Sequence, residues 1–381
     1  MAVVLRPGRV LLDEGFAEGR AVVLEGDRIA AVVRDNDPRA RAGEVVDLRG
    51  STLVPGFVDT QVNGGGGVLF NDAPTVETIR RIGAAHRRFG TTGFLPTLIS
   101  DDHSVIARAM DAVREAMAAR VPGVLGVHIE GPYISERRKG VHDPAKFREL
   151  DARGVTLLAS LGVGRTLVTL APEETGIEMI RSLAAKGVVI SAGHTDATCE
   201  QMQEAFANGV RGVTHLYNAM SPLNHRAPGV VGAALTDDEA YCGFIVDGRH
   251  VHPVALRVAL RCKPPDRMML VTDAMPIVGA DSDSFLLQGK RITVKDGVCV
   301  DEAGTLAGSA LDMATAVRNC VRDLGVTLEQ AVWMASGVPA GFLGLDRELG
   351  RIAPGYRASL VALDDTMRVT RSWIDGTESA E

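Results

Sequence analysis

Cysteine is scarce in this sequence, and its few copies are not arranged in pairs. The 381 residues include five cysteines. Their number is odd, their spacing is wide, and no two of them form a CxxC pair. This pattern suits free thiols in a reducing cytoplasm better than a disulfide framework or a zinc ribbon. The five positions are Cys199, Cys242, Cys262, Cys299 and Cys320.

The sequence also lacks an excess of positive charge and any long apolar run. It has 41 Lys and Arg against 48 Asp and Glu, a net charge of −7, which argues against nonspecific nucleic-acid binding. No stretch of about 18 uncharged apolar residues occurs, so we expect no membrane-spanning helix. Residues 1–12 contain Arg6 and Arg9 and no apolar core of a signal peptide, so we expect a cytoplasmic protein.

Aromatic residues make up only 4% of the chain, whereas glycine is abundant. Glycine supplies 42 of the 381 residues, about 11% against a typical usage of ~7%. Hydrophobic residues contribute 46% and charged residues 23%, which is typical of a globular protein with a large core. We therefore expect many tight turns and close backbone approaches, and no aromatic-rich binding surface.

Short β-prone runs, separated by turn signals, occupy both ends of the chain. No amphipathic helical pattern fits the first fifty residues. We therefore expect residues 1–53 and 348–381 to meet in one small β domain. The runs are Arg9–Leu12, Ala21–Glu25, Arg28–Val33 and Glu44–Leu48 near the start, and Ser359–Leu363 and Val369–Ile374 near the end.

The middle of the chain, residues 54–347, alternates apolar runs of four to six residues with longer helical patterns. The segment 75–90, for example, has apolar residues at helical spacing and is followed by the β-prone run Gly93–Leu98. About eight such units predict an α/β fold closed as a (β/α)₈ TIM-like barrel. An open doubly wound sheet is the alternative, but no GxGxxG follows a strand. Residues 281–306 resemble an inserted β-rich loop.

Polar residues follow four of the predicted barrel strands, where barrel enzymes carry their catalytic groups. Glu130, His194, His215 and Asp273 each stand at the end of an apolar run. Two His and one carboxylate, with an open fourth position, form a ligand set typical of a catalytic divalent metal. Asp273 would then face the activated water as a general base.

Each of these residues alone also has an ordinary structural explanation. A histidine at a strand end is often a satisfied polar residue, Glu130 could cap a turn, and Asp273 could cap the next helix. The joint placement at four strand ends carries the metal hypothesis. His142, His250 and Arg226 lie in nearby loop segments and could bind an anion or polarise a carbonyl; as single residues they could equally be solvated loop charges.

Longer motifs carry a resemblance to a known family. Val54–Asp59 is similar to the first-strand signature of the amidohydrolase superfamily. Other segments resemble the N-acetylglucosamine-6-phosphate deacetylase family of that superfamily, in order and over residues 8–375. These segments are Gln61–Gly64, His128–Pro132, Ala192–Thr195, Thr214–Met220, Asp247–Val251, Leu270–Ala274 and Gly304–Ser309.

The resemblance implies a barrel with a small β-sandwich formed by both chain ends, and a homodimer. It implies metal ligands at Glu130, His194 and His215, with Asp273 as the catalytic acid and base and His142 polarising the acetamide carbonyl. It further implies that the phosphorylated amino sugar is held by the residues Asn218, Ala219, His250 and His142, and by Arg226 of the neighbouring subunit. The implied reaction belongs to amino sugar catabolism: release of acetate from the N-acetyl amide of a sugar 6-phosphate.

One motif separates subgroups of the superfamily. Many amidohydrolases carry His-x-His at the end of the first strand and bind two metals, whereas this chain has Gln61 and Asn63 there. Amide side chains are weak ligands beside imidazole. We therefore expect one tightly held divalent metal per subunit, most simply Zn, with Fe, Co and Mn also compatible with the ligands.

Three other functions stay open at the level of sequence. The nearest is the same reaction on N-acetylgalactosamine 6-phosphate, which differs only at C4 and which no residue in the sequence discriminates. A second is hydrolysis of a cyclic amide, although such enzymes usually show His-x-His and a carboxylated lysine. The third is a barrel that serves as a non-enzymatic scaffold, which would be expected to have lost the four strand-end residues.

Overall fold

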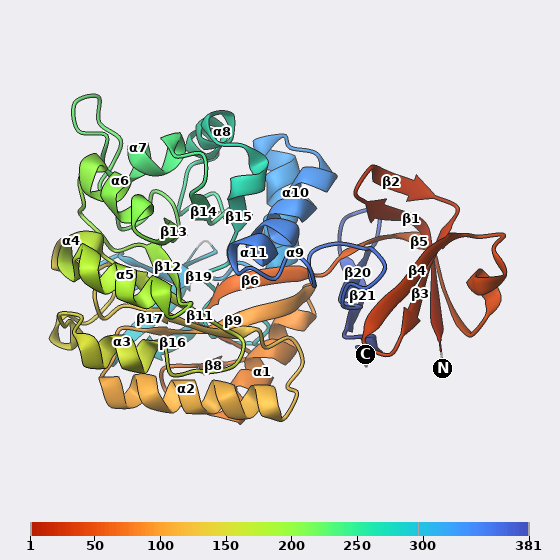
Figure 1. Ribbon diagram of the computed structural model, residues 1–381, viewed down its shortest axis with the longest axis horizontal. Helices are drawn as coiled ribbons and strands as arrows, with labels where there is room; N and C mark the ends of the chain where they lie inside the picture. Colours follow the sequence, from red (N-terminus) through yellow and green to blue (C-terminus); the bar gives the residue numbers. More distant parts are fainter. Residues whose placement is uncertain (1, 296, 380–381) are drawn as a thin grey trace.

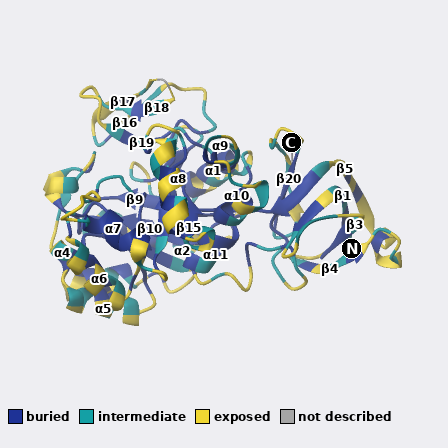
Figure 2. Ribbon diagram, turned by 90° about the horizontal axis from the view of Figure 1, so that it is seen from above, coloured by how far each residue is buried: buried dark blue, intermediate teal, exposed yellow. Residues whose placement is uncertain are grey.

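The computed structural model describes residues 2–295 and 297–379, and it shows two parts side by side. A (β/α)₈ barrel occupies the larger part, and a β-rich part formed by both chain ends lies against it (Figure 1). Nearly all positions of the barrel strands are buried, whereas the helices around them and the connecting loops have many exposed positions (Figure 2). The α/β barrel predicted from the alternation of apolar runs and helices is therefore confirmed.

Eight strands form the barrel sheet, and all neighbouring pairs run parallel. In chain order they are β6 (Phe57–Val62), β9 (Thr91–Ile99), β10 (Gly126–Glu130), β11 (Arg165–Leu170), β12 (Val189–Ala192), β13 (Val210–Val213), β14 (Tyr241–Phe244) and β15 (Met268–Leu270).

The barrel closes between its first and last strands. A parallel bridge joins Val62 to Ala274, and the buried Asp59 carboxylate accepts the Thr272 hydroxyl at 2.5 Å. The N–H of Asp273 also donates to the Gln61 carbonyl at 3.0 Å. These contacts bring the polar residues that follow β15 beside those of β6.

Helices cover the outside of the barrel. In α1, Thr75 accepts the N–H of Thr78 as an N-cap, while Ile79 and Ile82 face the core and the pair Glu77 and Arg80 faces solvent. The helices are α1 (Val76–Arg87), α2 (His103–Ala118), α3 (Ala152–Leu158), α4 (Pro172–Thr175), α5 (Ile177–Ala185), α6 (Cys199–Ala207), α7 (Gly229–Thr236), α8 (Pro253–Cys262), α9 (Met313–Asn319), α10 (Leu328–Ala335) and α11 (Gly337–Phe342).

Short helical turns complete the connections. They cover Pro38–Arg41, Glu136–Arg138, Pro144–Lys146 and Pro265–Arg267 as 3₁₀ turns and Cys320–Leu324 as a π-helical turn. None of the helices in the described part of the chain is long and apolar enough to cross a membrane.

The second sheet unites the two ends of the chain. Strand β5 pairs in parallel with β1 and antiparallel with β20, so the N-terminal and C-terminal strands share one ladder. The members are β1 (Val3–Leu12), β2 (Gly15–Glu18), β3 (Arg20–Glu25), β4 (Arg28–Arg34), β5 (Glu44–Pro55), β20 (Leu360–Leu363), β21 (Val369–Ile374) and β22 (Thr377–Glu378).

This sheet bends over its own apolar core. Leu24 and Ile29 from one end of the strand order pack in the same cluster as Leu360 and Trp373 from the other end. The expected sandwich is thus one continuous sheet folded over itself. We propose that the β-rich part and the barrel divide at residues 53/54 and 347/348.

The β-rich insertion expected at residues 281–306 is a four-stranded antiparallel sheet near the site. It contains β16 (Ser284–Leu287), β17 (Lys290–Lys295), β18 (Val298–Val300) and β19 (Leu306–Ser309). A two-stranded piece, β7 (Gly64–Gly65) and β8 (Val68–Leu69), follows β6. Gln288 donates a hydrogen bond from its side chain to the Ser100 carbonyl at 3.0 Å, which ties the insertion to the end of β9.

Candidate metal centre and active site

Four side chains converge from the carboxyl ends of the barrel strands. Glu130 ends β10, while His194, His215 and Asp273 each follow a strand by two or three residues. The three that follow strands have positive φ angles of 49°, 34° and 52°, which non-glycine residues adopt rarely and at a cost. The chain leaves each strand sharply there, and this turn points the side chain into the mouth of the barrel.

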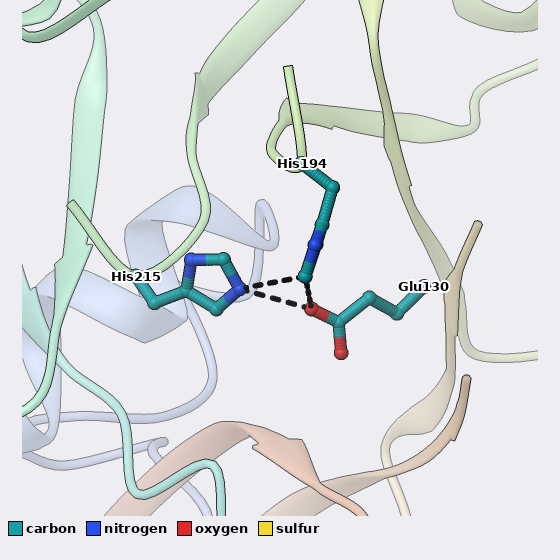
Figure 3. A group of neighbouring side chains, drawn as sticks. All are labelled: Glu130, His194 and His215. Carbon is teal, nitrogen blue, oxygen red and sulfur yellow. Dashed lines mark hydrogen bonds and ion pairs between the residues drawn. The ribbon is translucent and has the colours of Figure 1, made fainter. Parts of the chain in front are cut away.

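Glu130, His194 and His215 form a compact triangle (Figure 3). The Nε2 atoms of both histidines lie 3.1 Å from Glu130 Oε1 and 3.1 Å from each other. In a tetrahedral zinc site with metal–ligand bonds of 2.0–2.1 Å, ligand atoms are roughly 3.3 Å apart. The triangle therefore has the dimensions of a metal site.

The hydrogen bond at the far side of His194 supports the same reading. Its Nδ1 donates to the Arg138 carbonyl at 2.9 Å, which leaves the lone pair of Nε2 facing the Glu130 carboxylate. Metal-binding histidines are commonly held by such a hydrogen bond. Electron-rich atoms that converge in a buried site need a cation between them, so this donor set fits a divalent metal.

Charge coupling within the triangle is strong because all three residues are buried. Burial alone would raise the pKa of Glu130, but the two imidazoles beside it outweigh burial and hold the pKa well below its usual value. Burial would lower the pKa of His215, yet Glu130 outweighs burial and raises it. The carboxylate therefore stays ionised and available as a ligand.

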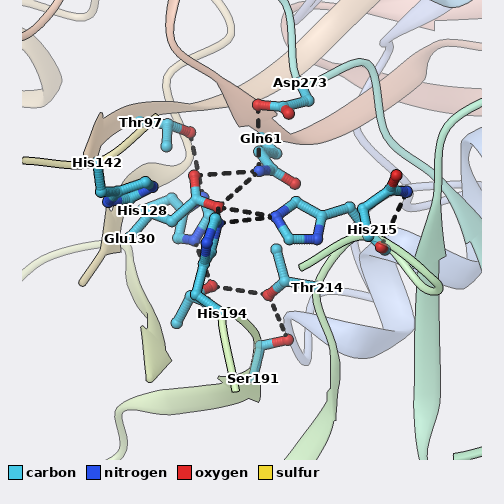
Figure 4. Close-up of polar contacts among 12 residues, drawn as sticks. Gln61, Thr97, His128, Glu130, His142, Ser191, His194, Thr214, His215 and Asp273 are labelled. Atoms are coloured by element: carbon cyan, nitrogen blue, oxygen red, sulfur yellow. Dashed lines mark hydrogen bonds and ion pairs between the residues drawn. The ribbon is translucent and has the colours of Figure 1, made fainter. Parts of the chain in front are cut away.

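Asp273 faces the triangle from across the barrel mouth (Figure 4). Its Oδ1 accepts hydrogen bonds from Asn63 at 2.6 Å and from Gln61 at 3.2 Å. Gln61 also donates to both oxygens of Glu130 at 3.1 Å. Burial first, and the charge of Glu130 second, raise the pKa of Asp273 from 3.8 to about 6. A carboxyl group tuned in this way can both accept and return a proton near neutral pH.

The ring of His142 lies beside that of His194 at a tilt of 53°, with ring centroids 4.4 Å apart. The Ser100 hydroxyl lies 2.7 Å from His142 Nδ1, and the Ser100 N–H donates to the same nitrogen at 3.4 Å. Because the backbone N–H can only donate, Nδ1 is the acceptor and the ring proton resides on Nε2. Burial first, and the neighbouring histidines second, hold the pKa of His142 well below its usual value. It is a neutral hydrogen-bond donor.

A second group of residues lines the same opening. His250 Nδ1 donates to Asp247 Oδ2 at 2.6 Å, and Asp247 also accepts the N–H groups of Arg249 and His250 at 2.8 Å. Asn218 donates from its side chain to the His215 carbonyl at 3.2 Å. Ala219 has a φ of 48° in the same turn.

A cavity of about 370 Å³ unites these residues. Every residue that the sequence singled out for the site lines it except Arg226. Arg226 is exposed in the loop between β13 and α7, and its side chain contacts His225 of the same loop at 2.9 Å. The lining residues among the predicted set are Glu130, His142, His194, His215, Asn218, Ala219, His250 and Asp273.

Several lining residues were not singled out as site residues from the sequence. Arg137 and Arg138 reach the cavity from the turn after β10, and Leu287, Thr305 and Leu306 reach it from the insertion. The run of charges at residues 136–139 was a visible signal for the two arginines. The motif at 304–309 marked the insertion, although no individual residue in it pointed to a contact.

Comparisons with known proteins identify the family of this chain. The model of the amidohydrolase family matches residues 52–378. Among curated proteins, N-acetylgalactosamine-6-phosphate deacetylase of Shewanella sp. (strain ANA-3) is 48% identical over 330 residues, which cover 86% of this chain and 83% of the relative.

Solved structures give the same result for the fold. N-acetylglucosamine-6-phosphate deacetylase from Pasteurella multocida superposes with a TM-score of 0.96 at 36% identity and covers all of both chains. A mutant of the Mycobacterium smegmatis deacetylase in complex with N-acetyl-D-glucosamine 6-phosphate has a TM-score of 0.90 at 33% identity, over 99% of this chain and 98% of that one. The chain therefore belongs to the amidohydrolase family, among the N-acetylglucosamine- and N-acetylgalactosamine-6-phosphate deacetylases.

Proposed function

We propose that this enzyme hydrolyses the acetamide of N-acetyl-D-glucosamine 6-phosphate to D-glucosamine 6-phosphate and acetate in a metal-dependent reaction. The observation that carries the proposal is the arrangement in one cavity of the Glu130, His194 and His215 triangle, the facing carboxylate of Asp273 and the donor His142. Two similar solved structures of the same family carry the name of this activity. The absence of a membrane-spanning helix among the described residues and the free thiols are compatible with a cytoplasmic location.

The triangle would hold one divalent metal ion, with Zn as the first candidate and Fe, Co and Mn as the others. Such an ion, when bound, supplies Lewis acidity that polarises a carbonyl and acidifies a water. We propose one ion per subunit because Gln61 and Asn63 stand where a second imidazole pair would be needed. Their amide nitrogens donate to Glu130 and Asp273 and thus already satisfy the carboxylates.

Asp273 would take a proton from the attacking water and return it to the leaving nitrogen. The amide donors Asn63 and Gln61 hold its carboxylate in place on the cavity wall. His142, with its proton on Nε2, would donate a hydrogen bond to the acetamide oxygen and stabilise the negative charge that develops there. In this proposal Asp273 carries out the proton transfer, and the neutral imidazole of His142 stabilises the charge on the carbonyl oxygen.

The sugar phosphate would lie against His250, Asn218 and the backbone of Ala219, with His142 above the acetamide. Arg226 would complete the phosphate site of the neighbouring subunit in a homodimer, because it is exposed and stands outside the cavity of its own chain. Its exposed loop neighbour Leu223, 54% exposed, would also be covered in such a dimer.

A mixing experiment tests the role of Arg226 in the neighbouring site. We expect Arg226→Ala and Asp273→Asn to be nearly inactive alone and to regain about a quarter of wild-type activity when refolded together in equal amounts. Half of the randomly formed dimers are then mixed, and each mixed dimer contains one complete site. No recovery, with mixed dimers verified by mass spectrometry, would contradict the shared site.

Ser100→Ala is expected to lower kcat about tenfold and to leave KM within about twofold. The substitution removes the hydroxyl contact to His142 Nδ1 at 2.7 Å and leaves only the longer backbone N–H contact at 3.4 Å. The ring is then held less firmly, so the hydrogen bond to the developing oxyanion is weakened in the transition state. Steady-state kinetics measure the split, and Ser100→Thr serves as the control that keeps the hydroxyl. A change in KM alone would argue against this role for His142.

N-Acetylgalactosamine 6-phosphate is a second candidate substrate, favoured by the 48% identity to a relative named for it. Acetate release should be measured on both sugar phosphates and on both unphosphorylated sugars, with the metal content of the same sample. The proposed function predicts the highest kcat/KM on the gluco phosphate. A higher value on the galacto phosphate would reassign the substrate, and no release from either would refute the proposal.

A further inference from the structure

The turn that presents His194 is held by residues that do not belong to the proposed metal triangle. His194 has a φ of 49° and follows Gly193 directly after β12. A non-glycine residue keeps such a conformation only where its surroundings enforce it. Backbone hydrogen bonds reach the turn from both sides, from Ser135 to the His194 carbonyl at 2.8 Å and from Thr195 to the Ala219 carbonyl at 3.1 Å.

Glu173 adds two short hydrogen bonds to the residues that follow His194. Its carboxylate accepts the Thr195 hydroxyl on Oε2 at 2.5 Å and the Asp196 N–H on Oε1 at 2.5 Å. Glu173 belongs to α4, which follows the neighbouring strand β11, and it is half-buried, whereas the next residue, Glu174, is exposed. Both carboxylate oxygens of Glu173 thus accept hydrogen bonds from the turn that follows β12.

Asp196 extends this chain of contacts to the other side of His194. Its carboxylate lies 2.8 Å from the Arg138 guanidinium and 3.4 Å from that of Arg137. The carbonyl of Arg138 in turn accepts the Nδ1 proton of His194 at 2.9 Å. The contacts therefore run from Glu173 to Asp196, from Asp196 to the Arg138 guanidinium, and from the Arg138 carbonyl to the imidazole of His194.

We propose that Glu173 is a positioning residue for the metal centre. It clamps the turn after His194 and, through Asp196, holds the Arg138 carbonyl that selects the tautomer of His194 and aims its Nε2 at the metal position. The proposal rests on the metal-binding part of the proposed function. It does not depend on which sugar is the substrate, because Glu173 does not line the cavity.

The test measures metal affinity in the absence of sugar. Glu173→Ala and Glu173→Gln are compared with wild type and with the exposed control Glu174→Gln in competition for Zn²⁺ against a chromogenic chelator. We expect a 10–100-fold weaker Kd for both Glu173 variants, the usual effect of losing a group that orients a metal ligand, and no change for Glu174→Gln. Asp196→Asn, which keeps the backbone N–H but weakens the Arg138 contact, should weaken binding in the same direction.

Kinetics measured with added metal distinguish a positioning role of Glu173 from a general loss of protein structure in its variants. Excess Zn²⁺ should restore most of the kcat of Glu173→Gln, with KM within about twofold of wild type. A Kd for Zn²⁺ within twofold of wild type in both Glu173 variants, or a wild-type protein that binds no divalent metal, would overturn the inference. The Glu173 variants could bind metal more weakly while wild type releases no acetate from either sugar phosphate. That result would refute the proposed function and leave this inference standing.

Discussion

Asp273→Asn is expected to lower kcat by at least 10²–10⁴-fold, the usual contribution of a general acid–base group. Asn has nearly the same shape as Asp and can still occupy the site beside Asn63 and Gln61, but it cannot accept the proton of the attacking water. Because Asp273 is not one of the three triangle residues, the variant should bind metal almost as well as wild type. The loss is therefore expected in kcat, with little change in metal content.

Metal analysis and acetate-release kinetics on the same preparation check this result. Asp281→Asn, at an exposed position in the loop before β16, is a matched control that removes one carboxylate at the surface and should leave kcat unchanged. The acid side of the pH–rate profile offers a second check. The base form of Asp273 is lost as the pH falls through its pKa, so wild-type kcat should fall with decreasing pH, and Asp273→Asn should not show this dependence. A variant with near wild-type rates would remove Asp273 from the mechanism.

The barrel and the position of its chemistry could be predicted from the sequence because both follow from local patterns. Apolar runs alternating with helical segments imply a parallel sheet, and polar residues at the ends of such runs must meet at one edge of it. This rule predicts Glu130, His194, His215 and Asp273 as site residues from the sequence alone. Their convergence on one cavity is what the structure adds.

Features that depend on contacts distant in sequence could not be predicted. The strands before His215 and Asp273 end at Val213 and Leu270, earlier than the apolar runs suggested, because the chain turns with positive φ at the functional residues. The role of the Ser100 contact also depends on a partner 42 residues away. A pattern of residue types contains no signal for a hydrogen bond of this kind.

The same limit applies to the residues around the metal ligands. Glu173 and Asp196 are ordinary charged residues in their local sequence, and only the fold brings the first against the turn that contains the second. The sequence predicts the proposed ligands by their residue types. The groups that fix the tautomer and direction of His194 come from three separate loops, after β10, β11 and β12, which only the fold brings side by side. Figure 4 shows the proposed ligands that these loops support.

Removing the metal is expected to abolish turnover and to destabilise the fold. Without a cation, the Glu130 carboxylate and the Nε2 atoms of the two histidines, 3.1 Å from it, lose the bonds to the metal that would hold the three strand ends together. A ligand present at about 1,000 times its Kd stabilises a protein by about 4 kcal/mol. Stripping with a chelator should therefore lower Tm by about 5 °C or more and reduce acetate release to the level of the buffer.

A titration of the stripped enzyme with Zn²⁺ measures both effects together. Activity and Tm should recover in parallel and reach their plateau at one equivalent per chain, because Gln61 and Asn63 leave the first strand without imidazole ligands. Glu130→Gln is the control: it loses a charged ligand, so neither the chelator nor added Zn²⁺ should shift its Tm appreciably. A plateau at two equivalents would contradict the single-ion site, and full activity in metal-free protein would contradict the metal-dependent reaction itself.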